Sequence, residues 1–450
     1  LMSTLSVVLS VLVVVVTLPY FNQLVGKSIS VDFGAWATWL IFFGLILILG
    51  LISGSYPALV MPRFSIANAL KGTVRQVGGA VYFRKVLVVF QFAITMILLV
   101  GTAVIYFQME YVLHKDLGLD KENLLIVRMH GDLAGRLDTY KNELLNIPEV
   151  VSVTATSGNP INYGRSTSSA SWEGKNPSQG YEINVILSDK DLVKTCGMTM
   201  AQGRDFSHTM NDSTNFLINE TAAELMGFEN PIGKSLSFWG IDGQIIGVVK
   251  NFHMRDMYRP IAPLIISCID PSRSGLALPR IQGNQPSAIS SIGEVTMSMN
   301  PAFDFEYDFV SNAYAENYQN ELTISTLARV FAIISIFIAC LGLLGLSAFT
   351  AEQRSKEIGI RRVHGASVSQ LVVLLSTDYS KLIIIALVIS TPVAFYYAQQ
   401  WLGHFKFSMS LNPFLFFAAG LCIFIVGAIT VGYKSLQAAR MNPVDTLKDE

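Results

Sequence analysis

A short charged stretch is the part of this sequence best suited to contact a partner. Residues 352–362 have the sequence EQRSKEIGIRR, in which six of the eleven residues are charged. Glu352 and Lys356, and likewise Glu357 and Arg361, are four residues apart with the glutamate first, which is the favourable order for an ion pair on a helix. The stretch is therefore expected to form a short charged helix.

Apolar and small residues in the same stretch suggest docking. Ile358, Ile360 and Val363 form a small apolar edge, and Gly359 and Gly365 allow close approach or a bend. Such a helix could dock on a partner and transmit force, or the stretch could be a solvated basic loop; physical reasoning alone leaves both open. The residues of this candidate coupling segment are Glu352, Arg354, Lys356, Glu357, Ile358, Gly359, Ile360, Arg361, Arg362 and Gly365.

Other residues that could do chemistry have weaker patterns. The stretch GFENPIGKS at 227–235 has five residues between its glycines, whereas a phosphate-binding loop needs four, so we interpret it as a turn before a strand. His208 and His253 lack the paired spacing of a metal site and are assigned structural or surface roles. Trp172 and Trp239 are expected to pack in a domain core. The sequence therefore indicates no catalytic residue, cofactor site or metal site in this chain.

The elements that position the coupling segment are predicted membrane helices. Hydrophobic residues make up 51% and charged residues 14% of the 450 residues, and the mean hydropathy is +0.45, whereas soluble domains have about 25% charged residues. A helix of roughly 20 apolar residues crosses a bilayer, and six uncharged runs reach that length. These runs are 1–26, 33–62, 86–109, 330–351, 382–403 and 407–433.

The distribution of Lys and Arg predicts the orientation in the membrane. The loop 63–85 holds five of them, the stretch 352–362 four and the C-terminal tail three, against one in each of the two alternate short loops. Basic loops stay on the cytoplasmic side. The coupling segment is therefore predicted to be cytoplasmic, and the long segment 110–329 to be extracytoplasmic.

The membrane runs contain no acidic, basic or histidine residue. Asp378 and Lys381 lie just outside the fifth run and are interpreted as an interfacial pair. Because ionisable residues within membrane helices usually mark ion or proton paths, a proton-driven transporter is disfavoured. The polar residues noted within the runs are Gln91, Thr95, Thr102 and Gln399.

Residues 110–329 have the composition of a soluble domain. They contain 26 of the 33 acidic and 17 of the 32 basic residues, a formal charge of −9, and they are long enough to bury a core. This charge gives no indication of nucleic-acid binding. Cys196 and Cys268 would allow one disulfide, but without a dense cysteine framework we expect two free thiols.

The outer segment is expected to be a split α+β domain. A β-α-β pattern at each of its ends is typical of a ferredoxin-like unit. The middle, roughly 159–260, is a glycine- and asparagine-punctuated insertion that we expect to be rich in short strands. The predicted strands are 123–129, 150–156, 244–249, 263–269, 276–281 and 303–309, and the predicted helices are 134–147 and 288–299.

An internal repeat indicates how the membrane helices are grouped. Residues 56–71 and 433–448 share Tyr, Leu, Arg, Leu and Lys at matching positions, and each follows a membrane run. We therefore expect two helices of a first module, followed by a complete four-helix module with the outer domain inserted after its first helix. The chain begins within an apolar run without the charged region of a signal peptide, so we expect that the first module is truncated.

The coupling segment also carries a resemblance to a known family. EQRSKEIGIRRVHGAS, at 352–367, resembles the signature of the MacB/FtsX-like permease superfamily of ABC transporters, and NPVDTLK, at 442–448, is similar to the second marker of that family. His364 departs from the pattern, since the family usually has an aliphatic residue there. Segments that resemble the periplasmic core domain of the family are GMTMAQGRDF (197–206), INETAAELMGFENPIGKSL (218–236) and IIGVVKNFH (245–253).

The resemblance implies a function and a set of partners. It implies the permease subunit of an ABC transporter in the bacterial inner membrane, which passes motion from a separate ABC ATPase, the holder of ATP and Mg, to a periplasmic domain. It also implies a homodimer or a tandem-module assembly and an amphipathic substrate such as a peptide or lipoprotein. The implied divisions are 1–72 (end of a first module), 73–110 (first helix of the second), 111–322 (MacB-like periplasmic core domain) and 323–450 (three helices of an FtsX-like domain with the coupling segment 352–367).

Two other functions remain open from the sequence. A membrane-anchored sensor or scaffold could use the same outer domain to control an extracytoplasmic partner, such as a cell-wall hydrolase. A secondary transporter is the third and least favoured alternative. Co-purification of an ATPase separates the first function from the other two.

Overall fold

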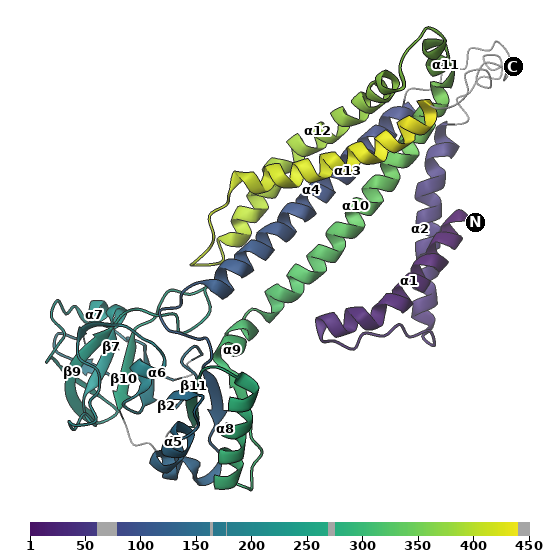
Figure 1. Cartoon of the computed structure of the whole chain (residues 1–450). Coiled ribbons are helices and arrows are strands. Elements are labelled where there is room, and N and C mark those ends of the chain that lie inside the picture. Colours follow the sequence, from purple (N-terminus) through teal and green to yellow (C-terminus); the bar gives the residue numbers. More distant parts are fainter. Residues whose placement is uncertain (61–78, 163–164, 177, 269–274, 440–450) are drawn as a thin grey trace. The chain divides into compact units, whose positions relative to one another are not determined.

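Six of the helices in this computed structural model, which describes residues 1–60, 79–162, 165–176, 178–268 and 275–439, are long and apolar enough to span a membrane. They occur where the uncharged runs predict them, and the chain is thus a multi-pass membrane protein. They are α1 (Met2–Val25), α2 (Trp36–Val60), α4 (Gly79–His114), α10 (Gln319–Gln353), α12 (Val368–Leu402) and α13 (Pro413–Ala439), as Figure 1 shows.

Helices α1 and α2 form a hairpin. Gly26 ends α1 in the left-handed conformation, with φ of 66°, and its N–H bonds to the Asn22 carbonyl. The Asn22 side chain then closes the connection, because its amide donates to the carbonyl of Ile29 (2.6 Å) and accepts from the N–H of Ile29 (3.1 Å). An asparagine placed before the helix end thus fixes the start of the turn.

The other four membrane helices pack through small and hydroxylated residues. The hydroxyls of Thr95 in α4 and Ser335 in α10 lie 2.8 Å apart. A Cβ at Gly342 would lie 2.4 Å from Oε1 of Gln91, and one at Gly427 would meet a side chain of α12 at 2.5 Å. Lipid tails are as apolar as the helix surfaces, so no hydrophobic force drives membrane helices together. Small residues allow the close approach on which their packing depends.

The outer segment is an α/β domain built on a twelve-stranded sheet. Its first and last parts contain β1 (Leu125–Arg128), η2 (Gly131–Arg136), α5 (Leu137–Leu145), β2 (Val150–Thr156), β11 (Leu276–Ile281), α8 (Gln285–Met299), β12 (Tyr307–Phe309) and α9 (Val310–Glu316). The middle contains β3 (Ser166–Thr167), β4 (Ser171–Trp172), β5 (Ile183–Ser188), α6 (Leu192–Thr195), β6 (Met200–Gly203), β7 (Phe216–Asn219), α7 (Glu220–Met226), β8 (Ser235–Phe238), β9 (Ile241–Val249) and β10 (Leu264–Cys268).

The two ends of the segment combine into one half of the sheet. The strand order there is β12-β1-β11-β2, with every pair antiparallel and Ala277 opposite Ala155. Helices α5 and α8 lie side by side on one face (Figure 1), where Tyr140 and Ile292 share a core with the strands. This order is consistent with the predicted split unit, because each β-α-β end contributes two strands and one helix.

The insertion forms the other half, in the order β5-β10-β7-β9-β8-β4. Trp172 is buried in its core, as predicted. The prediction for Trp239 is wrong, since its side chain is 45% exposed. Trp239 and Gly240 lie between β8 and β9 with positive φ (52° and 78°), so the tight turn points the ring outwards.

A few contacts connect these two halves. Strands β2 and β5 are paired at one register position, Thr156 opposite Ser188. Beside it, Nζ of Lys141 in α5 lies 2.5 Å from Asp189 and 2.6 Å from Asp191, which follow β5. These three charged side chains are largely buried, which strengthens their attraction relative to surface pairs.

The outer ends of the membrane helices share a hydrophobic core with this domain. One buried cluster contains Val112 of α4, Tyr314 of α9, Phe405 of the α12–α13 loop and, from the outer domain, Phe252 and Met257. The chain accordingly divides into two compact units, of which one comprises 97–328 and 391–419 and the other 1–96, 329–390 and 420–450. The outer domain is thus held by packed side chains in addition to covalent connections.

Candidate functional site

The coupling segment is helical, as predicted. Helix α11 (Ser355–Val363) lies between α10 and α12, and within it the guanidinium of Arg361 donates to the carboxylate of Glu357 at 2.8 Å. Gly365 ends the helical stretch with φ of 89°, a conformation that favours glycine. The predicted pair of Glu352 with Lys356 lies outside the side chains that the structure describes.

Ile358 fixes α11 to the neighbouring helix. Its side chain is 7% exposed and packs against Leu371 and Leu375 of α12. This position corrects the prediction that Ile358, Ile360 and Val363 form one apolar edge for a partner, because Ile358 is buried while Ile360 (52% exposed) and Val363 are accessible. Each residue of an α-helix is rotated by about 100° from the one before it, so the side chains of residues i and i+2 point about 200° apart. Ile358 and Ile360 therefore cannot share a face.

An ion pair adds a second attachment. The guanidinium of Arg354 donates to the carboxylate of Asp378 at 3.1 Å, with both side chains about 40% exposed. The sequence interpretation paired Asp378 with Lys381, and the structure corrects it. The change arises because the turn of the chain through α11 brings the end of α10 beside α12, a long-range contact that spacing along one helix does not reveal.

The face of α11 that remains accessible is amphipathic. Ile360 and Val363 (64% exposed) are apolar, while Glu357 and Arg361 are exposed and charged. We call these four residues the docking face. The side chains of Lys356, Gly359 and Arg362, which the sequence analysis also assigned to the segment, lie outside the described set.

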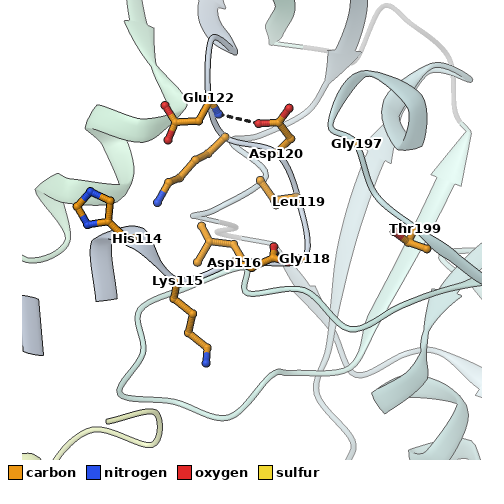
Figure 2. A pocket seen from close by; sticks show the side chains of 11 residues that line it. His114, Lys115, Asp116, Gly118, Leu119, Asp120, Glu122, Gly197 and Thr199 are labelled. Carbon is orange, nitrogen blue, oxygen red and sulfur yellow. Dashed lines mark hydrogen bonds between the residues drawn. The ribbon is translucent and has the colours of Figure 1, made fainter. Parts of the chain in front are cut away.

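A polar pocket of about 360 Å³ lies where α4 enters the outer domain. Figure 2 shows Asp120 and Glu122 on one side of it, and Lys115 on the other side, extending away from both. Arg280 pairs with Asp120 at 2.7 Å, and Lys115 donates to the hydroxyl of Tyr111 at 2.7 Å. Asp120 and Lys115 are thus engaged within the protein, so we assign the pocket a structural role.

The residues of the weaker motifs lie in a turn, at the surface or in the core of the outer domain. Residues 227–234 form a turn between α7 and β8, as predicted. His208 is exposed and lies 3.0 Å from Asp191, and the part of the chain that the structure describes holds no group of three metal-ligating side chains. Cys196 and Cys268 are free thiols, and burial raises the pKa of Cys196 to about 12.

His253 is buried at the outer end of the membrane helices. Its ring lies edge-on to that of Phe407, with the centroids 4.6 Å apart. Burial, and secondarily the charge of Lys115, lowers its pKa to about 4, against an opposing effect of Asp116. The neutral ring is therefore part of the packing between the outer domain and the α12–α13 loop.

The sequence analysis missed Gln108, which is fully buried near the outer end of α4. Its amide bonds to the α12–α13 loop in two places. The sequence feature that could have indicated it is a side-chain amide next to the end of the uncharged run 86–109. Its partners are about 300 residues away, so the sequence could not name them.

Comparisons with known proteins match both parts of the chain. The model of the FtsX-like permease C-terminal family matches residues 329–443, and that of the MacB-like periplasmic core domain matches residues 87–281. The second family marker at 442–448 lies beyond the described residues. The first match contains the whole of α11, and the second ends with strand β11.

Several curated proteins share this similarity. The macrolide export ATP-binding/permease protein MacB of Chromobacterium violaceum is 22% identical over 288 residues, which are 59% of this chain and 43% of that protein. The protein of the same description from Psychrobacter cryohalolentis is 21% identical over 274 residues, 57% of this chain and 41% of that protein. The chain thus spans about two fifths of the length of these relatives.

Solved structures of outer domains also show similarity. The periplasmic region of MacB from Actinobacillus actinomycetemcomitans has a TM-score of 0.34 and 18% identity, and covers 46% of this chain and 98% of that one. The extracellular domain of the noncanonic ABC-type transporter YknZ from Gram-positive bacteria has a TM-score of 0.31 and 14% identity, and covers 41% and 98%.

Proposed function

Because the chain belongs to the MacB/FtsX-like ABC permease family, we propose that it passes motion from a separate ATPase to its own periplasmic domain. The ATPase, with its ATP and Mg, would dock on the cytoplasmic side of the bacterial inner membrane. The work done by the periplasmic domain would be export or extraction of an amphipathic substrate such as a peptide or lipoprotein.

The observation that carries this proposal is the form of α11. It is a nine-residue helix whose inward side is packed on α12 through Ile358, while Ile360, Val363 and Arg361 on other sides are exposed. A solvated basic loop would need neither the buried isoleucine nor the attachment to α12. Force applied to the docking face would therefore act directly on a membrane helix.

The composition of the membrane helices supports motion rather than conduction. Their apolar central runs contain no acidic or basic residue, and the polar atoms of Thr95 and Ser335 bond to each other between α4 and α10. Groups that bind ions or protons are expensive in a membrane and mark transport paths where they occur. This favours a mechanical permease over a secondary transporter.

The test is purification of the full chain with its ATPase, followed by measurement of ATP hydrolysis. The variant Ile360→Glu places a charge on the docking face, and Ser369→Glu places the same charge at an exposed position at the start of α12. We expect Ile360→Glu to lose the ATPase and its stimulated hydrolysis, while Ser369→Glu retains both at wild-type expression. Wild-type retention and hydrolysis in Ile360→Glu would contradict docking at α11, and an absence of any ATPase from the wild type would favour the sensor or scaffold.

A further inference from the structure

The loop between α12 and α13 is hydrogen-bonded to the outer domain. The backbone N–H groups of Lys406 and Phe407 both donate to the carbonyl of Met257, at 3.0 and 3.2 Å. The N–H of Met257 in turn donates to the hydroxyl of Tyr318 at 2.7 Å, just before α10 begins. One residue of the outer domain therefore connects the loop to the segment that leads into α10.

Gln108 of α4 holds the same loop from the other side. Its Nε2 donates to the carbonyl of Phe407 at 3.2 Å, and its Oε1 accepts from the N–H of Met409 at 2.8 Å. Both bonds are shielded from water, because Gln108 has no exposed surface. The side chain thus supplies hydrogen-bond partners to backbone groups of this irregular loop, which a regular helix or strand would otherwise pair.

Aromatic packing surrounds these bonds. The rings of Tyr258 and Phe405 are stacked, with centroids 4.3 Å apart and an angle of 27° between their planes. The hydroxyl of Tyr258 donates to the carboxylate of Glu321 in α10, and Phe407 contacts His253. Hydrogen bonds and ring contacts therefore connect the α12–α13 loop with the outer domain and with the start of α10.

We propose that Gln108 is the positioning residue that fixes the α12–α13 loop on α4 in the place where the loop bonds to Met257 of the outer domain, and so forms the extracytoplasmic end of the coupling path. We call Gln108, Met257, Tyr258, Phe405 and Phe407 the outer latch. The proposal rests on the proposed function, since it names how motion of α12 reaches the periplasmic domain.

The path follows from the continuity of α12. This helix runs from Val368 to Leu402 with Pro392 inside it. It carries the contacts of α11 at one end and leads into the loop of the latch at the other. A displacement of α12 would move Phe405 and Phe407 with it. Because the N–H of Phe407 donates to the carbonyl of Met257 and the ring of Phe405 stacks on Tyr258, the outer domain would have to follow.

The test uses the full chain in nanodiscs with its co-purified ATPase, and hydrogen exchange with and without ATP and orthovanadate. Gln108→Met keeps the length of the side chain but removes both bonds. The matched control is Gln399→Met, at an exposed position of α12. Loss of a hydrogen bond of about 1.4 kcal/mol corresponds to about tenfold faster exchange, so we expect that increase at the Met409 amide in Gln108→Met and none in the control.

The nucleotide response separates positioning from a merely structural role. We expect Gln108→Met to retain ATP hydrolysis within about twofold of the wild type, because α11 is untouched, and to lose the nucleotide-dependent change in exchange of the outer domain. A full nucleotide response together with faster Met409 exchange would overturn the proposal. If the wild type itself shows neither an ATPase nor a nucleotide response, the proposed function fails and the proposal fails with it.

A covalent tie between the loop and the outer domain provides a second variant, whose first measurement is made in the chain with Gln108 intact. A thiol crosslinker would join Arg259→Cys to Lys406→Cys, two exposed positions beside the latch, in a chain whose exposed Cys422 is replaced by Ala. If the latch moves as one piece, the crosslinked chain keeps hydrolysis and the nucleotide response, and adding the crosslink to Gln108→Met restores the response. Loss of the response on crosslinking would show that the loop must leave the outer domain during turnover, which contradicts the proposal.

Discussion

The two ends of the membrane helices are held together in different ways. At the extracytoplasmic end, Val112, Tyr314, Phe405 and Met257 are buried in one core, and Gln108 adds two shielded hydrogen bonds. At the cytoplasmic end, α11 packs on α12 through a small cluster around Ile358, and Arg354, just before α11, forms a half-exposed pair with Asp378. The attachment of α11 to α12 is thus smaller and more exposed than the packing at the outer end.

The magnitudes explain what this difference does. Each large apolar side chain that is fully buried contributes about 1.5–3 kcal/mol, and several act together in the outer core. An exposed ion pair contributes about 0–1 kcal/mol. A force applied at the cytoplasmic end is therefore expected to displace that end first, while the outer ends and the periplasmic domain move as one piece.

The largest expected effect comes from weakening the outer core. Phe405→Ala removes a buried ring that stacks on Tyr258, and a buried Phe→Ala change costs about 3–5 kcal/mol. Phe414→Ala removes an exposed ring near the same end of α13 and should change stability little. Denaturant unfolding of the full chain in detergent measures both; equal effects would mean that the outer ends are not packed as described.

Reversal of a docking-face charge is expected to have the next largest effect. Glu357→Lys turns the attraction to Arg361 into repulsion, a helix effect of only about 0.5 kcal/mol, whereas loss of a buried charged contact at an interface costs about 2–5 kcal/mol. We expect unchanged insertion and about a thirtyfold or greater loss of ATPase affinity. A change of twofold or less would assign Glu357 to helix stability alone.

Acid should weaken the outer end through His253. Its pKa is about 4 in the folded chain and about 6.5 when unfolded, so between these values the unfolded chain binds the extra proton. The contribution is fully present above pH 6.5 and falls as the pH decreases towards 4, on the order of 1 kcal/mol between pH 7 and 5. His253→Phe should flatten this dependence of the unfolding free energy, which denaturant unfolding at a series of pH values measures.

The smallest expected effect concerns the cytoplasmic ion pair. Arg354→Ala leaves Asp378 in contact with solvent, since both side chains are about 40% exposed, so stability should fall by less than about 1 kcal/mol. The measurement is the unfolding transition of the full chain compared with that of Phe405→Ala. A loss as large as that of Phe405→Ala would remove the contrast between the two ends.

Local patterns predicted much of the fold. Strand β2 occupies 150–156 as expected, because alternating β-branched residues follow a Pro-Glu turn, and the uncharged runs locate all six membrane helices. The pattern of charges likewise predicted α11 and its Glu357–Arg361 pair. These features depend on residues close together in the sequence.

Contacts between distant segments could not be predicted in the same way. The inward position of Ile358 depends on where α12 returns, and the partner of Asp378 depends on the end of α10. Gln108 and Phe407 are joined across 299 residues. Trp239 was assigned to a core, but the two positive φ angles at Trp239 and Gly240 place it in a tight turn where its ring is exposed.

The most direct test of the account is a pair of distances measured by spin labels in the reconstituted complex. One pair is placed on Glu352 and Gln370 at the cytoplasmic ends of α10 and α12, and the other on Arg259 and Lys406 at the outer latch; all four positions are exposed. With ATP and orthovanadate, the account predicts a changed distance for the cytoplasmic pair and a constant one for the outer pair. A changed outer distance, or two constant distances during ATP hydrolysis, would contradict it.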